Sequence, residues 1–477
     1  MKQGISSMTM ESNNCVTLPA SFRDPSGFIF QHEGEIYRQV NRSYREHYQM
    51  LIDSGLYAAL VKEGMLIPHD EVDDPIADES RVWRILKPEP ISLISYPYEW
   101  CFSQLKDAAL LTLDIQRIAL EHGMCLKDAS AYNVQFHRGR PIFIDTLSFE
   151  PYTEGLPWVA YRQFCQHFLA PLAVMAKRDV RLMQLKRAQI DGLPLDLTSM
   201  LLPRRTWLNY GLLMHIHLHA RTQKAFAASH KAPSETTLRL SKVSKVGLIG
   251  LLDGLRKIIT KLEWKPGGTE WGDYYNDTNY SDSSFEIKRR HIAAFLDDVD
   301  PREVWDLGAN IGLFSRISSD RGLSTVAFDI DPSAVEINYR QIQKQNETYL
   351  LPLLLDLTNP SPGLGWGSTE RDALLVRGPV DCIMALALIH HLSISNNIPF
   401  GWVASFFADL SSDSLIIEFV PKSDSQVQRL LRSREDIFID YDREHFEQAF
   451  SEYFTIRRAE AIEGSERILY LMKKNQD

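Results

Sequence analysis

The chain has 477 residues, of which 44% are hydrophobic and 24% are charged, values typical of a soluble protein with two or three domains. Its formal net charge of -10 excludes a general nucleic-acid binder. Five scattered cysteines predict a reduced, cytoplasmic protein, and no apolar run is long enough for a spanning helix. The polar N-terminus lacks the apolar core of a signal peptide, and we expect residues 1–20 to be disordered.

Residues 21–226 are predicted to form an α+β domain, and their clearest chemical pattern lies near the middle. Asp128 is followed, five residues later, by Asn133, then by a short hairpin and an apolar strand that ends in Asp145. In phosphoryl transfer, an Asp orients the hydroxyl group, while an Asn and a second Asp hold magnesium. A preceding helix, roughly residues 104–122, fits the same arrangement.

This pattern resembles the catalytic lobe of protein-kinase-like and aminoglycoside-phosphotransferase-like folds, over roughly residues 25–190. The resemblance implies Mg-ATP as a cofactor of this domain. The sequence departs from the family because Leu126 stands where a His is usual, no Gly-rich phosphate loop is visible, and Arg38 lies where a strand lysine is expected. The alternatives are a degenerate kinase-like scaffold or a helical recognition domain in which Asp128 and Asn133 stabilise a loop.

Residues 227–269 are predicted to be a basic linker followed by a helix. Residues 201–262 hold eleven Lys or Arg and two acids, a net charge of +9. Apolar residues at helical spacing in 238–262 predict an amphipathic helix, which either contacts anionic lipid peripherally or is a solvated linker. Just upstream, His215 and His219 would share a helix face with no third ligand, so we expect no metal site.

Residues 270–477 are predicted to form an α/β domain with a parallel sheet. A helix is expected over 285–299, and helical stretches separate the later strands. This alternation is typical of a parallel sheet that is covered on both faces. The expected strands are 303–307, 324–329, 350–355, 380–387, 414–420, 454–461 and 466–472.

The first strand of this domain ends in an acid and a glycine turn, Asp306 to Gly312. Gly308 and Gly312 let the backbone turn sharply and approach a ligand closely. The Gly-x-x-x-Gly spacing lacks the third glycine of a dinucleotide site. Asp306 can accept a hydrogen bond from a cationic amino group.

The next two strands also end in acids. Asp329 can accept hydrogen bonds from both hydroxyls of a ribose, Ile330 can pack on an adenine face, and Asp356 can accept from the adenine amino group. Three acids at successive strand ends, after a glycine turn, predict a nucleoside pocket at the carboxyl edge of the sheet. Helix capping or strand ending is the structural alternative for each acid alone.

Together these motifs resemble those of class I S-adenosylmethionine-dependent methyltransferases, over roughly residues 270–477. The resemblance implies a Rossmann-like seven-stranded sheet with a reversed final hairpin, and S-adenosylmethionine as the cofactor. It also implies a lid segment upstream, in which Tyr280 can bond a carboxylate. The further cofactor contacts that it implies are Asn310, Leu357 and Ala385.

Three residues are candidates for the base that a hydroxyl acceptor needs. His390 and His391 follow the fourth strand, and Glu418 ends the fifth. The alternatives are a helix start for the histidines and pairing with a neighbouring cation for Glu418. The sequence does not distinguish among the three.

The whole chain also resembles a bacterial two-part methyltransferase group related to the nodulation protein NoeA. The segments that carry this resemblance are residues 22–27, 96–100 and 418–422. This resemblance implies methyl transfer to a small molecule or glycan-type metabolite. It does not identify the methylated atom, and our first hypothesis is methylation of a hydroxyl group. The alternatives are a bifunctional enzyme with an N-terminal ATP-dependent phosphotransferase, and a membrane-surface or scaffold protein.

Overall fold

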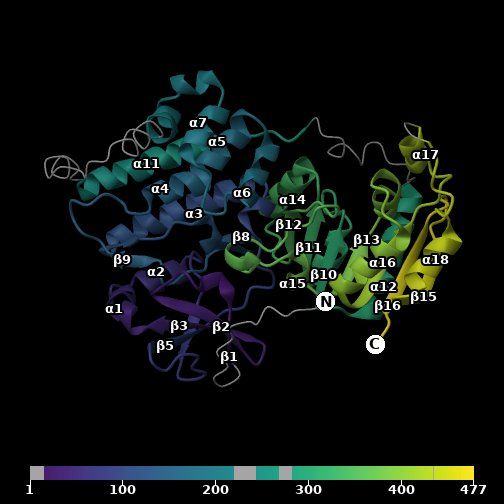
Figure 1. The fold of residues 1–477 in the computed structure, drawn as a ribbon, viewed down its shortest axis with the longest axis horizontal. Coiled ribbons are helices and arrows are strands. Elements are labelled where there is room, and N and C mark those ends of the chain that lie inside the picture. The colour runs from purple at the N-terminus through teal and green to yellow at the C-terminus, as the bar shows by residue number, and fades with distance from the viewer. Residues whose placement is uncertain (1–14, 220–242, 268–281, 433–434, 477) are drawn as a thin grey trace.

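The structure is a computed structural model that describes residues 15–219, 243–267, 282–432 and 435–476. An N-terminal and a C-terminal domain lie side by side (Figure 1). Near their boundary lie β8 (Arg140–Phe143) of the first domain, and α14 (Pro332–Gln345) and β12 (Leu350–Leu354) of the second.

The N-terminal domain begins with a five-stranded antiparallel sheet in the order β1-β2-β3-β5-β4. Residues 1–14 lie outside the described residues. The expected disorder of residues 15–20 is wrong at residues 15–17, which form β1 and pair with β2, with Cys15 buried. The elements of this part are β1 (Cys15–Thr17), β2 (Gly27–His32), β3 (Glu35–Asn41), α1 (Arg45–Asp53), α2 (Leu56–Lys62), β4 (His69–Val72) and β5 (Val82–Pro88).

The second part of this domain is built around the buried helix α3 (Phe102–Glu121), which confirms the helix expected over 104–122. β6 (Met124–Leu126) pairs with β9 (Phe149–Pro151), and β7 (Val134–His137) pairs with β8. The loop between β6 and β7 carries Asp128 and Asn133, and Asp145 follows β8. The helices that complete this part include α4 (Tyr161–Phe164), α5 (Ala170–Lys177), α6 (Leu185–Ala188), α7 (Leu195–Leu201) and α8 (Tyr210–Leu212).

The basic helix is α11 (Lys245–Lys261), and it belongs to the N-terminal domain. Its apolar side chains Leu248, Leu252, Leu255 and Ile259 are buried in contact with α3. The expectation of a solvated linker or of a lipid-binding face is therefore wrong for these residues, because their apolar face already has a protein partner. Residues 220–242 lie outside the described residues.

The C-terminal domain contains a seven-stranded sheet in the order β12-β11-β10-β13-β14-β16-β15. The first five of these strands are parallel, and β16 runs antiparallel to both of its neighbours. This confirms the predicted sheet and its reversed final hairpin. Its other strands are β10 (Glu303–Leu307), β11 (Ser324–Asp329), β13 (Val380–Ala385), β14 (Ser411–Phe419), β15 (Phe454–Ala461) and β16 (Ile468–Lys474).

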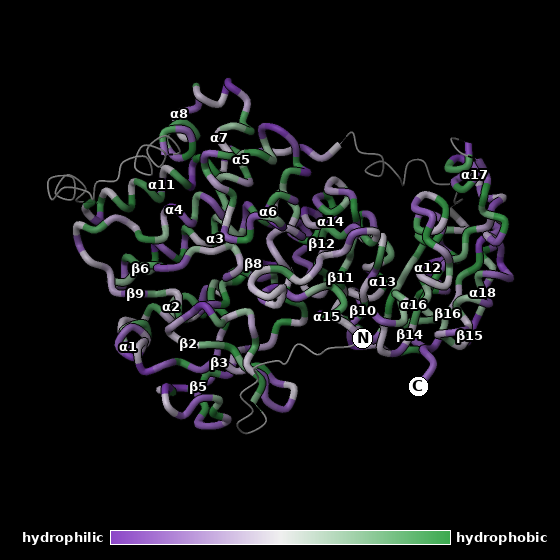
Figure 2. Tube along the Cα trace, viewed as in Figure 1, coloured by the Kyte–Doolittle hydropathy of each residue, from purple (hydrophilic) through white to green (hydrophobic). Residues whose placement is uncertain are grey.

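Helices cover the sheet and bury its apolar side chains. Hydrophobic residues are frequent along α16 (Phe400–Leu410), of which Phe407 is fully buried (Figure 2). The core continues between the domains, where the rings of Phe136 and Tyr339 pack edge to face with their centroids 5.8 Å apart. The remaining helices of this domain include α12 (Asp282–Val299), α13 (Ser315–Ser319), α15 (Leu374–Arg377), α17 (Ser425–Leu431) and α18 (Arg443–Ser451). In the described part of the chain, no helix combines the length and apolar character needed to span a membrane.

Candidate active site

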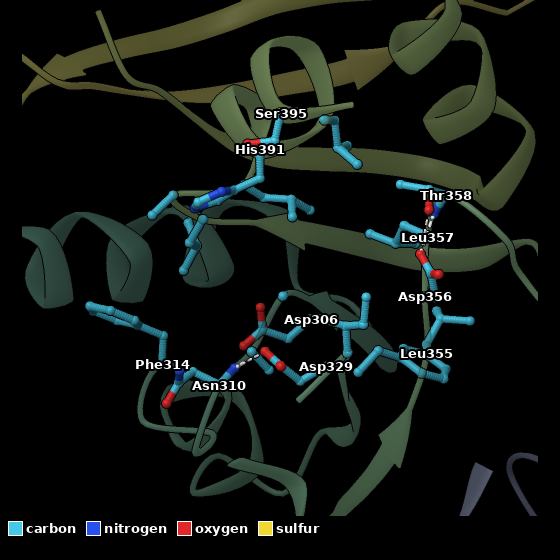
Figure 3. Close-up of a pocket in the computed structure, with 18 of the residues that line it drawn as sticks. Asp306, Asn310, Phe314, Asp329, Leu355, Asp356, Leu357, Thr358, His391 and Ser395 are labelled. Carbon is cyan, nitrogen blue, oxygen red and sulfur yellow. Dashed lines mark hydrogen bonds between the residues drawn. The ribbon is translucent and has the colours of Figure 1, made fainter. Parts of the chain in front are cut away.

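A pocket of about 340 Å³ lies at the carboxyl ends of β10, β11, β12 and β13 (Figure 3). Parallel strands bring their carboxyl ends to one edge of the sheet, where open α/β sheets bind their ligands. Asp306 and Asp329 lie on one side of the pocket, and His391 and Ser395 lie on the opposite side (Figure 3). Asp356, Leu357 and Thr358 form a third wall.

The glycine turn after β10 has the backbone conformation that its sequence predicts. Gly308 has a φ of +79°, and a Cβ built on it would lie 3.2 Å from the Leu388 side chain. Gly308 and Asn310 line the pocket. Gly312, with a φ of +75°, lies instead against α14, because a Cβ there would come within 2.4 Å of the Asn338 amide. Its role is close packing of the turn on α14.

Asp329 is the most firmly oriented of the pocket acids. Its Oδ2 accepts a hydrogen bond of 2.7 Å from the backbone N–H of Asn310, and its Oδ1 accepts one of 2.8 Å from that of Asp331. Burial raises its pKa to about 6, although these two hydrogen bonds favour the charged form. The carboxylate is thus held at the strand end, with its remaining lone pairs available for a ribose.

Asp306 lies deeper in the pocket, with only 1% of its surface exposed. Its Oδ2 accepts a hydrogen bond of 2.6 Å from Ser315 Oγ. Burial raises its pKa to about 7, and the charge of Lys288 opposes that rise. A buried carboxyl group of this kind gains most from a cationic ligand, because a positive charge stabilises its ionised form.

The third wall combines an acid with apolar side chains. Asp356 Oδ1 accepts hydrogen bonds from the backbone N–H and the hydroxyl of Thr358, at 2.9 Å and 2.6 Å. Ile330 lines the pocket and is 57% exposed, so it offers an apolar face to a flat ring. Leu357 lies beside them. The nucleoside residues predicted from strands β11 and β12 are therefore together.

Of the two histidines after β13, only His391 lines the pocket. The His390 and His391 rings lie 4.0 Å apart between centroids. Burial lowers the pKa of His391 to about 4 and also holds that of His390 well below its usual value. Both rings are thus neutral at pH 7, and His391 can accept a proton from a group in the pocket.

Glu418 has a different environment from the one that a base needs. Its Oε2 accepts hydrogen bonds from Lys288 Nζ at 2.5 Å and from the backbone N–H of Ala387 at 2.8 Å, and Oε1 lies 3.5 Å from Arg467 Nη1. All three charged side chains are almost fully buried. Glu418 therefore pairs with the buried Lys288 and holds Ala387 in its left-handed conformation, with a φ of +49°, while Arg467 is paired more closely with Asp424, at 2.7 Å.

Two predicted cofactor residues of the described part of the chain, Gly312 and Ala385, do not line the pocket. Ala385 is fully buried inside β13, and the residues that follow it, Leu386 to Leu388, line the pocket instead. Tyr280 lies outside the described residues. No sequence motif predicted several other pocket residues, because they lie in α12, just before α13, in α17, and in or directly after the π-helix His391–Ser395: Phe285, Lys288, Phe314, Leu430, Leu392, Ser395 and Asn396.

In the N-terminal domain, Asp128, Asn133 and Asp145 come close together. Asn133 Nδ2 donates a hydrogen bond of 3.1 Å to Ser148 Oγ, and Ser148 Oγ donates to Asp145 Oδ2. Burial raises the pKa of Asp128, and the negative charge of Asp145 adds to that rise. Asp128 Oδ1 also accepts a hydrogen bond of 2.8 Å from Gln163 Nε2.

The same acids do not fit a magnesium ion. Arg38 Nη2, on β3, lies 2.6 Å from Asp145 Oδ1 and 3.1 Å from Asp24 Oδ2. A guanidinium group therefore supplies the positive charge that a metal would supply at Asp145. Asp145 and Arg38 are both largely buried, which strengthens their attraction relative to a surface pair.

The strand order, the glycine turn and the acids at successive strand ends define the C-terminal domain as having the class I S-adenosylmethionine-dependent methyltransferase fold. The nodulation protein NoeA of Rhizobium meliloti (strain 1021) is 35% identical to this chain over 460 residues, which is 96% of each chain. The chain belongs to the NoeA family. The predicted resemblance to that group is thus confirmed.

No protein-family profile matches the chain. Similar solved structures include magnesium protoporphyrin IX methyltransferase from Synechocystis PCC 6803 with bound SAH, at 15% identity and a TM-score of 0.31, covering 43% of this chain and 93% of that one. The N-methyltransferase NodS from Bradyrhizobium japonicum WM9 has 9% identity and a TM-score of 0.30, covering 41% and 99%. WbdD with a kinase inhibitor has 14% identity and a TM-score of 0.29, covering 46% and 47%.

Proposed function

We propose that this protein transfers the methyl group of S-adenosylmethionine to a hydroxyl group of a small molecule or glycan-type metabolite. The observation that carries the proposal is the arrangement of Asp306, Asp329 and Asp356 at three neighbouring strand ends around one pocket, with His391 on the wall opposite Asp306 and Asp329. A nucleoside that also bears a cationic amino acid would satisfy all three acids. S-adenosylmethionine has these groups.

The cofactor residues have separate tasks in this proposal. Asp329 holds the ribose, Ile330 and Asp356 hold the adenine, and Asp306 pairs with the amino group of the methionine part. S-adenosylmethionine supplies an electrophilic methyl group, so the protein mainly has to align a nucleophile with it. The apolar side chains of Phe314 and Leu388 line the same pocket and exclude water from it.

We assign the base to His391 and a positioning role to Glu418. His391 lines the pocket in its neutral form, so one of its ring nitrogens can take the proton of the acceptor hydroxyl. Glu418 already accepts from Lys288 and Ala387, so it holds the turn that carries the histidines. A neutral base suits a hydroxyl acceptor, because an alcohol loses its proton as it is methylated.

Two measurements test the proposal: binding of S-adenosylmethionine, and detection of the methylated product. Calorimetry should detect S-adenosylmethionine binding by the full chain. Metabolite profiling of a strain that lacks the gene should show a compound about 14 Da lighter than its wild-type counterpart, since one CH₂ is missing. Binding without any such mass difference would retain the cofactor and refute the proposed acceptor class.

The reaction belongs in a reducing compartment such as the cytoplasm. All five cysteines are described, and all are free and buried. A second activity in the N-terminal domain, ATP-dependent phosphoryl transfer, finds no support at Asp145, whose counter-charge is Arg38. We therefore propose methyl transfer alone as the activity of this chain.

A further inference from the structure

The two segments that follow the adenosine-binding acids both lie against the N-terminal domain. α14 begins three residues after Asp329, and the segment 357–377 begins directly after Asp356. The opposite wall of the pocket is built within the C-terminal domain, from His391 and the Lys288–Glu418 pair beneath it. The N-terminal domain is thus joined to one half of the pocket.

The first contact fixes the beginning of α14. Glu336 lies in the second turn of α14 and is fully buried. Its Oε2 accepts a hydrogen bond of 2.9 Å from the backbone N–H of Ser103, and its Oε1 accepts from Ser103 Oγ. Ser103 lies in the first turn of the 20-residue helix α3, where backbone N–H groups lack helix partners and favour a carboxylate. Each helix therefore restrains the other.

The same face of α14 continues this contact toward its C-terminal end. Tyr339 Oη donates a hydrogen bond of 2.8 Å to Asp107 Oδ2 on α3. Gln343 Nε2 donates one of 2.6 Å to the carbonyl oxygen of Gly139, in the β7–β8 hairpin. Residues 336, 339 and 343 recur at helical spacing, so the N-terminal domain holds α14 along its length.

The second contact fixes the segment that follows Asp356. Arg377 and Glu99 form a two-pronged ion pair, with Nη1–Oε2 and Nη2–Oε1 distances of 2.9 Å and 2.5 Å. Their side chains are only 4% and 1% exposed. Glu99 Oε1 also accepts from Ser361 Oγ at 3.2 Å, and Tyr96 Oη accepts from the backbone N–H of Asp372 at 2.7 Å. The segment is thus tied to the N-terminal domain at Ser361, Asp372 and Arg377, and Arg23 adds a pair with Glu370.

We propose that the N-terminal domain positions the adenosine half of the S-adenosylmethionine pocket, through Glu99 on Arg377 and Ser103 on Glu336. This inference rests on the proposed function. Glu99 and Ser103 are positioning residues, because they act through Asp356 and Asp329 and touch no cofactor. Loosening either contact lets a strand end move, and small displacements of binding groups are costly in a preorganised site.

The test uses two ligands that differ in one half. S-adenosylhomocysteine carries both the adenosine and the amino acid part, whereas 5′-methylthioadenosine lacks the amino acid part. Glu99→Gln and Arg377→Met, each in the full chain, should raise the calorimetric Kd of both ligands by the same factor, about five- to tenfold. Asp306→Asn should raise the Kd of S-adenosylhomocysteine alone.

Arg38→Met is the matched control for a general loss of stability. It removes a largely buried ion pair of the same domain, with side chains 11% and 14% exposed, in which neither Glu336 nor Arg377 takes part. It should lower the melting temperature and leave both Kd values unchanged. If Arg377→Met does not fold, the Kd values of Glu99→Gln, which keeps the side-chain shape, decide the test.

The outcomes separate the two proposals. Failure of the wild-type protein to bind either ligand would overturn the proposed function and this inference with it. Normal wild-type binding together with unchanged Kd values in folded Glu99→Gln and Arg377→Met would overturn this inference alone. A loss confined to S-adenosylhomocysteine, or an equal loss in Arg38→Met, would also overturn it.

Discussion

The carboxylate of Asp329 and the backbone N–H of Asn310, 19 residues earlier in the chain, are joined by a hydrogen bond of 2.7 Å. This bond ties the glycine turn after β10 to the end of β11. The turn and Asp329 are therefore one unit, and both Gly308 and Asn310 line the pocket beside Asp329. Preorganisation of this kind lowers the entropy cost of binding.

Asp329→Ala should weaken S-adenosylmethionine binding by about 1.5–3 kcal/mol, because it removes hydrogen bonds to a charged acceptor. Calorimetry of the purified variant measures the change. Asp320→Ala, at an exposed acid of the same domain, is the control and should bind normally. An unchanged affinity in a folded Asp329→Ala protein would refute the ribose assignment.

Asp306 should make binding depend on pH. Burial raises its pKa to about 7, so much of the carboxyl group is neutral at pH 6 and ionised at pH 7.5. Only the ionised form attracts the ammonium group of S-adenosylmethionine, so affinity should increase as pH rises through this range. Calorimetry at pH 6.0, 6.8 and 7.5 measures the trend.

Two controls isolate that effect. Asp306→Asn should reduce this increase in affinity to the part that Asp329 contributes, since an amide does not titrate and the pKa of Asp329 is about 6. 5′-Methylthioadenosine, which has no ammonium group, should show no rise due to Asp306 in the wild-type protein. The same raised pKa favours the protonated folded state, so it should make the ligand-free protein less stable as pH rises from about 4 to 7. A pH-independent Kd for S-adenosylmethionine would contradict the assignment.

His391→Gln should reduce methyl transfer by about 10²- to 10⁴-fold, because it removes the proton acceptor. The affinity for S-adenosylmethionine should stay within about twofold, since His391 faces the acceptor end. Transfer is followed with methyl-labelled S-adenosylmethionine and a metabolite extract from a strain that lacks the gene. His445→Gln, at a half-exposed histidine on α18, is the matched control. Equal incorporation by both variants would exclude His391 as the base.

Glu418→Gln should mainly affect stability. It leaves Lys288 buried without its carboxylate, which costs about 3–5 kcal/mol of unfolding free energy, whereas Arg467 keeps its pair with Asp424. Urea denaturation of wild type and variant measures this loss. A variant that is as stable as wild type but inactive would reverse the assignments of Glu418 and His391.

The sequence predicted the sheet of the C-terminal domain well because each central strand is a continuous apolar run that ends in a polar residue. It also placed Asp306, Asp329 and Asp356 correctly at one edge, because parallel strands leave little freedom there. It did not predict the role of Lys288, whose partner Glu418 lies 130 residues later. Such a pair has no local pattern.

The absence of a local pattern also explains why the sequence did not predict the partner of α11 or the contact between the two domains. The apolar stripe of α11 predicts burial, but not that α3 is the surface that covers it. Glu99 and Arg377 lie 278 residues apart, and each alone is typical of a surface residue. Ala385 and Gly312 matched family motifs, yet whether each lines the pocket depends on where β13 ends and on the close packing of Gly312 against Asn338 of α14.

The phosphoryl-transfer pattern of the N-terminal domain, Asp128, Asn133 and Asp145, should not bind Mg-ATP. Arg38 occupies the counter-charge position at Asp145, so Mg-ATP at millimolar concentration should not shift the melting temperature of the full chain. Arg38→Met should lower the unfolding free energy by about 2–3 kcal/mol, because it leaves the largely buried carboxylates of Asp24 and Asp145 without their cation. A magnesium-dependent thermal shift that Asp145→Asn abolishes would show the opposite, that Arg38 yields to a metal and that the domain has kept a nucleotide site.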